Sequence, residues 1–420
     1  MSAPVPLSPL ARAKGPNVGL TVGVIGVVVL SLASFGVIFI LAGAIGDATL
    51  VATSGLMALF PLAFVIWAVL AIDRWEPEPR IALWFAALWG GVGAVLLTLL
   101  LNEAVLQPLV APFLRTPEQF EFYATVIQAP FTEELWKAVP VVIMFLFFRK
   151  TFDGPVDGIV FAALSAAGFA FTENILYFGT SISETGDGAF IFFMRGIMSP
   201  LTHAIFTSVG IGLALGFAAR LRSRWWILLA FPAGHLVSAL LHALWNSASW
   251  WVPGGTVGFF AYYLVVQVPL CVIAAGLVWL LLRQEIKITR ARLHDYGRAG
   301  WFSREEVERL SSGDGRALLL DWAKRRGMRA QMQQYIRTAT RLANHRQQAL
   351  VGRDRAKHVA DEVTLLAKLM HVRRTMAGAV IGQPVPIEQG RAMAVPNGAT
   401  PGGPRVQRFG DLDPAWPTRR

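Results

Sequence analysis

Apolar residues run through most of the chain in stretches of about twenty or more, separated by short polar segments. A stretch of about 20 apolar residues is long enough to cross a bilayer as a helix. The pattern predicts about eight spans, at residues 18–45, 50–72, 81–105, 123–148, 157–180, 190–219, 225–247 and 257–282. The first is too long for the apolar core of a signal peptide, so we expect an uncleaved span. The predicted fold class is all-α, a polytopic bundle of membrane helices.

Basic residues mark every second loop between these stretches. They are Arg12 and Lys14, Arg74 and Arg80, Arg149 and Lys150, Arg220, Arg222 and Arg224, and Arg283 with Lys287. The intervening loops hold few positive charges, and one of them carries Glu118 and Glu121. Because cytoplasmic loops are enriched in Lys and Arg, the alternation predicts that both termini are cytoplasmic. We expect a multi-pass protein of the cell membrane.

The chain changes character after Arg283. Residues 301–374 are charged and helical in pattern, and Ser303 with Glu306 has the spacing of a capping box. Proline and glycine dominate from residue 378 onward, a composition typical of disorder. The predicted organisation is a cytoplasmic N-terminus at 1–17, a membrane domain at 18–283, a basic helical cytoplasmic domain at 284–376 and a disordered tail at 377–420.

Composition supports a membrane protein and narrows its partners. Of the 420 residues, 54% are hydrophobic and 15% charged, and the formal net charge is +11. The positive charge lies in loops beside the apolar stretches and in the tail, where anionic lipid is the nearest partner. No DNA-recognition motif accompanies it, so we expect no nucleic-acid partner. The single cysteine, Cys271, excludes a disulfide or cysteine metal cluster within this sequence.

The fourth apolar stretch contains the charged segment Glu133-Glu134-Leu135-Trp136-Lys137. Each charged residue near the centre of a membrane helix costs about 2.5–3.5 kcal/mol. Lys137 follows Glu134 by three residues and Glu133 by four, so both carboxylates can reach its ammonium. One lysine cannot fully neutralise two carboxylates, which leaves one of them as a candidate general base. A structural ion pair in a transporter or scaffold is the alternative.

Further polar side chains occur on the next three predicted spans. They are Glu173 and Asn174 on the fifth, His203 on the sixth, and His235, Ser238, His242 and Asn246 on one stripe of the seventh. At about 1.5 Å of rise per residue, the carboxylates and histidines fall at middle to outer depth. Each alone has a structural explanation, such as a hydrogen bond between helices. Their convergence predicts a polar cavity that opens outward.

Four motifs follow one another on successive spans: Glu133-Glu134-x-x-Lys137, Phe169-x-x-x-Glu173-Asn174, His203-x-x-x-Thr207 and His242-x-x-x-Asn246. In this order they resemble the PrsW family of intramembrane proteases, which is distantly similar to the CAAX-prenyl endopeptidases and bacteriocin-immunity proteins. The loop at residues 73–79 is similar to the EPEP loop of that family. The resemblance covers about residues 50–250. Asn246 stands where some members have Asp, and His235 matches no motif, so we expect His235 to be structural.

The resemblance implies hydrolysis of a peptide bond in or beside the membrane, in a membrane-protein substrate such as an anti-sigma factor. It implies catalytic roles for Glu133, Glu134, Lys137, Glu173, Asn174, His203, His242 and Asn246. One of the paired glutamates would activate water, while the lysine keeps the other ionised. Glu173 with Asn174 would orient or share the proton. The two histidines, helped by Asn246, would stabilise the oxyanion.

Two alternatives stay open on the sequence. Glu173, His203 and His242 could form a zinc site, with Glu133 or Glu134 as the base. We favour the form that requires no cofactor, because there is no compact HExxH pair and an ion pair with Lys137 suits a glutamate mechanism. A scaffold or proton-coupled transporter would use the same buried carboxylates, but the inverted repeats typical of transporters are not evident in the sequence. For the basic helical domain we expect a partner-docking or membrane-surface role.

Overall fold

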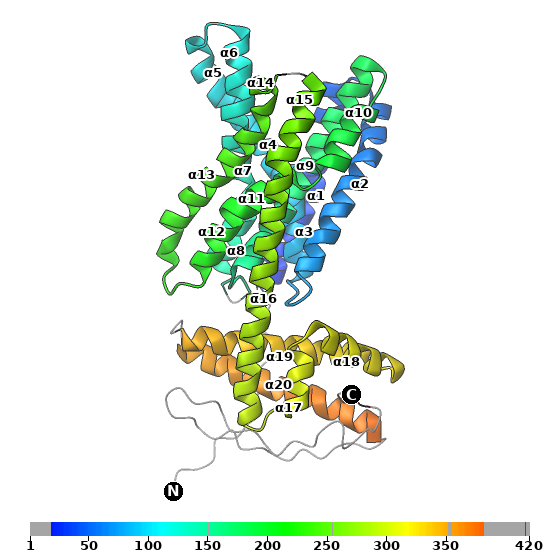
Figure 1. Ribbon diagram of the computed structural model, residues 1–420, viewed down its shortest axis with the longest axis vertical. Coiled ribbons are helices and arrows are strands. Elements are labelled where there is room, and N and C mark those ends of the chain that lie inside the picture. Colours follow the sequence, from blue (N-terminus) through cyan, green and yellow to red (C-terminus); the bar gives the residue numbers. More distant parts are fainter. Residues whose placement is uncertain (1–17, 150, 254, 352–354, 382–415, 417–420) are drawn as a thin grey trace.

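The computed structural model describes residues 18–149, 151–253, 255–351, 355–381 and 416. Every secondary-structure element in these ranges is a helix, as predicted. Long helices form an upright bundle, and a layer of further helices lies across beneath it (Figure 1). In the names that follow, η3 and η7 are 3₁₀ helices and the other η elements are π-helical segments inside longer helices.

The helices of the bundle follow one another along the chain. The first group is α1 (Val18–Ile45), α2 (Ala48–Ile72), α3 (Arg80–Leu88), η1 (Trp89–Ala94), α4 (Val95–Leu101), η2 (Asn102–Leu106), α5 (Gln107–Val110), η3 (Ala111–Phe113), α6 (Pro117–Phe122), η4 (Tyr123–Gln128), α7 (Ala129–Lys137) and α8 (Val139–Phe147). The second is α9 (Pro155–Thr185), α10 (Ala189–Phe192), η5 (Phe193–Met198), α11 (Thr202–Thr207), η6 (Ser208–Gly212), α12 (Leu213–Ala219), η7 (Arg224–Trp226), α13 (Ile227–Asn246), α14 (Ala248–Trp251), α15 (Gly255–Tyr262), η8 (Tyr263–Gln267) and α16 (Val268–Arg298).

In the described part of the chain, seven helical runs are long and apolar enough to cross a membrane: Leu20–Ile45, Ala48–Ile72, Arg80–Phe113, Pro155–Thr185, Ala189–Ala219, Arg224–Asn246 and Gly255–Arg298. They match seven of the eight predicted spans. The remaining span, 123–148, is helical but interrupted at Ala138, and it carries the three charges of the Glu133–Lys137 segment. Pro140 explains the interruption, because proline has no N–H to bond the carbonyl of Trp136. The indole of Trp89 donates to that carbonyl instead, at 2.9 Å.

Helix α9 is the centre of the bundle and packs against α2, α3, α11 and α12. All its residues from Pro155 to Phe169 are buried. Small residues on α9 allow close approach: a Cβ built on Gly168 would lie 1.9 Å from the carbonyl oxygen of Ala87 on α3. On Gly158 it would lie 2.0 Å from that of Gly212. Glycine at these two positions lets neighbouring helices touch backbone to backbone.

The layer beneath the bundle begins inside α16. This helix runs on to Arg298, so the predicted border at 283–284 falls within one helix. It is followed by α17 (Arg304–Leu310), α18 (Gly313–Arg325), α19 (Arg329–Leu350) and α20 (Arg355–Ile381). Leu293 and Tyr296 at the end of α16 are fully buried in the apolar core of this layer, together with Trp322. We call residues 284–381 the C-terminal layer. The predicted tail, 377–420, lies mostly outside the described residues. Its first part continues α20, and Trp416 packs on Trp322.

Local chemistry fixes the start of α17 as predicted. Ser303 Oγ accepts from the Glu306 N–H at 3.1 Å, and Glu306 Oε2 accepts from the Ser303 N–H at 2.7 Å. The capping box is therefore confirmed. The other oxygen of Glu306 pairs with Arg373 of α20 at 2.8 Å, which ties the first and last helices of the layer together.

The C-terminal layer contacts the loop between α2 and α3. Arg316 of α18 lies over the Trp75 ring, 3.3 Å from its centroid, and donates to the Trp75 carbonyl at 2.8 Å. The Trp75 indole donates to Thr289 of α16 at 3.3 Å. Asn344 of α19 also donates to the carboxylate of Glu76. This loop and the layer thus lie on one face of the bundle, the same side on which the charge alternation puts them.

Candidate active site

Lys137 lies at the centre of a polar cluster inside the bundle. Its side chain is fully buried, and Nζ is 3.0 Å from Glu133 Oε2, 3.0 Å from Glu134 Oε1 and 3.1 Å from His203 Nδ1. An ammonium has three N–H donors and no acceptor, so these three contacts satisfy it. The Phe169 ring closes a further side, with Nζ 4.0 Å from its centroid. Both ion pairs expected from the helical spacing are present.

Glu134 is held from several sides. Its Oε2 accepts from the Thr207 hydroxyl at 2.7 Å, and its Oε1 lies 3.1 Å from His242 Nδ1 as well as 3.0 Å from Lys137. The side chain is fully buried. Because a carboxylate offers only acceptors, His242 Nδ1 carries the proton of this contact. The second nitrogen of His242 faces Glu133 Oε2 at 3.9 Å, beyond hydrogen-bond reach.

Glu173 and Asn174 of α9 meet the cluster from a third helix. Glu173 Oε2 lies 2.9 Å from His203 Nε2, and the same oxygen accepts from Arg195 of η5 at 2.5 Å. The Arg195 Nε–H donates to Asn174 Oδ1 at 2.7 Å. Because His203 Nδ1 accepts from Lys137, its Nε2 is the protonated nitrogen and donates to Glu173. Both ring nitrogens of His203 are therefore engaged.

Two predicted positions lie outside this cluster. Asn246 donates from Nδ2 to the Thr125 carbonyl of η4 at 2.9 Å, a contact that joins α13 to the helix before α7. His235 packs its ring against Phe131, 4.6 Å between centroids, and against Phe231 at 6.0 Å. Neither of its ring nitrogens has a hydrogen-bond partner among the described residues. This environment fits the structural interpretation of His235.

Three ligand-type side chains converge: Glu133, His203 and His242 are buried, and one ligand atom of each lies within 4.8 Å of the others. Two imidazoles and one carboxylate are a common donor set for catalytic zinc. The set differs from the predicted one because Glu133 takes the position expected of Glu173. Glu173 instead bonds Arg195 and His203, so it lies behind the histidine.

Residues 78–274 match the family model of the PrsW family intramembrane metalloproteases. This part of the chain is similar to the PrsW-family proteases. The matched range contains all eight predicted site residues and the whole polar cluster. No curated protein and no solved structure matches the chain. The resemblance found in the motifs is thus confirmed, and with it a peptidase of the membrane.

Two residues of this polar cluster were not among the predicted site residues. Thr207 stands in a motif, but the sequence equally allows its hydroxyl to bond only its own helix; it also approaches the His203 carbonyl at 3.1 Å. Arg195 was missed altogether. The signal was a lone arginine in the apolar run of span 190–219, where a buried charge marks either a functional site or a partner carboxylate.

Proposed function

We propose that this chain is a PrsW-family protease and cleaves its substrate with water activated by Glu133. The observation that carries this assignment is the contrast between the two adjacent glutamates. Glu134 is sealed off, with Lys137, Thr207 and His242 on its oxygens. Glu133 keeps 10% of its side chain exposed, and its Oε1 has no hydrogen-bond partner among the described residues. A general base must lie within hydrogen-bond reach of the water whose proton it takes. Of the two glutamates, only the less enclosed Glu133 can meet this condition.

The remaining side chains orient the reaction. Glu134 fixes His242 through Nδ1, and Glu173 fixes His203 through Nε2. Both nitrogens of His203 are already engaged, so His203 orients Lys137 and Glu173. His242 keeps Nε2 for the substrate; once protonated there, it would donate to the oxyanion of the tetrahedral intermediate, where a donor contributes about 10²–10³ in rate. Lys137 keeps the cluster from accumulating negative charge. Asn246 holds α13 against η4, so in this proposal it positions His242 rather than contacting the oxyanion.

The substrate we infer is a membrane protein whose cleaved bond lies in or beside the bilayer. All cluster residues lie on helices of the bundle, so a soluble peptide would have to enter the bilayer region to reach them. An anti-sigma factor is the substrate class that the family resemblance suggests. The charge alternation favours a cell-membrane protein with both termini in the cytoplasm and a site nearer the outer face.

The test is cleavage of a single-span membrane substrate by purified protein. Glu133→Gln keeps the size of the side chain but removes the base, so the rate should fall by about 10²–10⁴-fold. His242→Ala should lower the rate by about 10²-fold or more, since it removes the candidate oxyanion donor. His203→Ala should also lower it, since it removes the ring that orients Lys137 and Glu173. Glu121→Gln, an exposed carboxylate on α6, is the matched control and should cleave normally. Full activity of Glu133→Gln would show that Glu133 is not the general base.

A zinc-dependent form is the second candidate, and the convergence of Glu133, His203 and His242 favours it. Zinc held there would acidify a bound water and polarise the scissile carbonyl. The donor set suits the metal, but His203 Nδ1 becomes available only when Lys137 turns away from it. We favour the form without metal because the lysine already supplies the positive charge.

Metal analysis of active, purified protein decides between the two forms. The metal-free form predicts that cleavage persists after dialysis against a strong chelator, with zinc well below one equivalent per chain. Loss of activity together with about one equivalent of zinc, and recovery on zinc addition, would establish the metal form.

A further inference from the structure

Carboxylates gather where the bundle meets the C-terminal layer. They lie on the α2–α3 loop, the α8–α9 loop, the first turn of α9 and α16: Asp73, Glu76, Glu78, Asp153, Asp157 and Glu285. This group is distinct from the cluster around Lys137. Along α9 alone, Asp157 and Glu173 are roughly 24 Å apart at 1.5 Å of rise per residue. The proteolytic chemistry proposed above makes no use of it.

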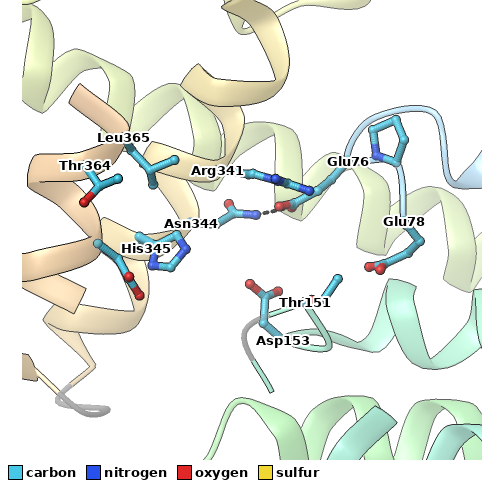
Figure 2. A pocket seen from close by; sticks show the side chains of 11 residues that line it. Glu76, Glu78, Thr151, Asp153, Arg341, Asn344, His345, Thr364 and Leu365 are labelled. Atoms are coloured by element: carbon cyan, nitrogen blue, oxygen red, sulfur yellow. Dashed lines mark hydrogen bonds between the residues drawn. The ribbon is translucent and has the colours of Figure 1, made fainter. Parts of the chain in front are cut away.

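A cavity of about 250 Å³ lies among these carboxylates. The bundle lines it with Glu76, Glu78, Thr151 and Asp153, while α19 and α20 of the C-terminal layer line the other side (Figure 2). Asp361 on α20 is among the lining residues of that second side. The cavity is therefore shared between the two parts of the molecule, and its walls are rich in oxygen atoms.

Glu78 is the carboxylate in the cavity wall that has no partner for one of its oxygens among the described residues. The residue is only 6% exposed, and its Oε2 is buried with no hydrogen-bond partner in the part of the chain that the structure describes. Its carboxylate points into the cavity, toward Thr151 and Asp153 (Figure 2). A buried carboxylate that has lost its water is costly unless a proton or a cation compensates it. The side chain is thus placed to receive a ligand.

Among the described residues that line the cavity, acidic side chains outnumber basic ones. Four of the lining side chains are carboxylates, whereas Arg341, beside Glu76, is the guanidinium in the described lining and His345 the imidazole. Burial, with Asp157 and Glu76 nearby, holds the pKa of the Glu78 carboxyl well above its usual range. A cation of higher charge than a proton would relieve several of these carboxylates together.

We propose that the cavity binds a hard divalent cation, Ca²⁺ or Mg²⁺, through the carboxylates of Glu76, Glu78 and Asp153. Carboxylates, hydroxyls and amide oxygens are the ligands such ions prefer, and the lining supplies them. At roughly 30 Å³ for each water molecule, the volume leaves room for an ion that keeps several of its waters. Asp361 supplies a further carboxylate from the C-terminal layer.

The position of the site gives the cation a definite role. Its ligands come from two loops of the bundle and from α20, so a bound ion links the bundle to the C-terminal layer. The α8–α9 loop leads directly from the helices that carry the paired glutamates to the helix that carries Glu173. A bound cation would therefore stabilise the α8–α9 loop and its contact with the C-terminal layer.

Direct binding to the full-length protein in detergent is the first test. Equilibrium dialysis with radioactive calcium, and titration with Mn²⁺ followed by electron paramagnetic resonance, should each give about one ion per chain. Ca²⁺ avoids imidazole ligands, so it does not report on the zinc candidate within the membrane. Glu78→Gln and Asp153→Asn should each weaken binding at least tenfold. Asp321→Asn, an exposed carboxylate on α18, is the matched control and should bind as the unmodified chain does.

Thermal unfolding separates a ligand role from a purely structural one. A ligand that binds only the folded protein raises its melting temperature, so Ca²⁺ should stabilise the unmodified chain relative to chelator. Glu78→Gln replaces a buried acid with a neutral side chain of the same size, and its melting temperature in chelator should equal or exceed that of the unmodified chain. Its response to Ca²⁺ should be lost.

Three results would overturn the proposal. One is no saturable binding of Ca²⁺, Mg²⁺ or Mn²⁺ by the unmodified protein. Another is unchanged affinity in both Glu78→Gln and Asp153→Asn. The last is cation binding by Lys150→Gln but not by the unmodified protein. Lys150 lies next to Thr151 in the sequence, so this result would mean that its ammonium, rather than a divalent cation, neutralises the carboxylates.

Discussion

Lys137 decides whether the membrane cluster can exist at all. Two ionised glutamates side by side in the bundle would repel one another and lose their hydration, a combination that costs several kcal/mol for each ion. The ammonium lies 3.0 Å from each carboxylate and 3.1 Å from His203, so one cation links residues of two different helices. The same contacts set which nitrogen of His203 is protonated. A single side chain thus defines both the charge balance and the tautomer.

Arg195 should act as a positioning residue. It holds Glu173 and Asn174 simultaneously, and its guanidinium stacks on Tyr177 at 4.0 Å from the ring centroid. Arg195→Gln should lower kcat by up to about 100-fold with little change in KM, because orientation is lost while substrate contacts remain. Arg195→Lys should recover only part of the rate, since an ammonium lacks the planar fork that serves two partners. The measurement is a kcat and KM comparison on one membrane substrate.

The exposed Arg115 offers the control for this comparison, and Arg115→Gln should leave both constants unchanged. A rise in KM with kcat intact in Arg195→Gln would identify the arginine as a substrate-binding residue instead.

At this scale the sequence predicts what lies on one helix better than what meets across helices. The sequence spacing of Glu133, Glu134 and Lys137 is enough to predict their contacts in a helix, and both ion pairs are present. The contacts of Thr207 with Glu134 and of Arg195 with Glu173 depend on how helices are rotated about their axes, which residue spacing does not determine. For the same reason the converging triad contains Glu133 where Glu173 was expected.

Among the elements, α9 shows how glycine sets the distance between helices. Gly168→Ala would drive a methyl group to 1.9 Å from the Ala87 carbonyl, so α3 and α9 must separate. We expect a loss of about 1–3 kcal/mol in stability, the usual range for overpacking. Gly276→Ala on α16 is the matched control, because a Cβ there meets nothing within 4 Å. Unfolding of both variants in mixed micelles measures the difference; equal stabilities would mean that the close approach is not needed.

Element boundaries could be predicted where composition alone sets them. Seven apolar stretches appear as helices of membrane length. Five lie near their predicted limits, whereas the runs that begin at Arg80 and Gly255 extend beyond theirs, to Phe113 and Arg298. The exception, 123–148, follows from Pro140, whose missing N–H interrupts the helix at Ala138. The π-helical segments, such as η6 beside His203, could not be predicted, since they arise from tertiary contacts. Ser238 is an example: its hydroxyl serves the Phe206 carbonyl at 2.9 Å and the Ile211 N–H at 3.2 Å.

In the whole molecule, the residues of the polar cluster and those of the C-terminal layer occupy separate parts of the sequence. Every residue of the polar cluster precedes residue 247, so a chain truncated after Glu285 keeps all of them. We expect such a chain to cleave its substrate within about threefold of the full-length rate, a difference below about 1 kcal/mol. The comparison uses one fixed substrate at equal membrane levels of the two proteins. A truncated chain that inserts fully but does not cleave would make the layer part of the catalytic machinery.

Helix α16 has a mechanical consequence. It leaves the bundle without a break and ends inside the apolar core of the C-terminal layer, where Leu293 and Tyr296 are fully buried. From Arg283 to Arg298 the helix extends roughly 22 Å at 1.5 Å of rise per residue. A rod of that length turns a tilt of about 5° in its membrane half into a shift of about 2 Å at its far end. A continuous helix, unlike a flexible linker, transmits displacement in both directions. A force that moves the C-terminal layer therefore also tilts the last membrane helix.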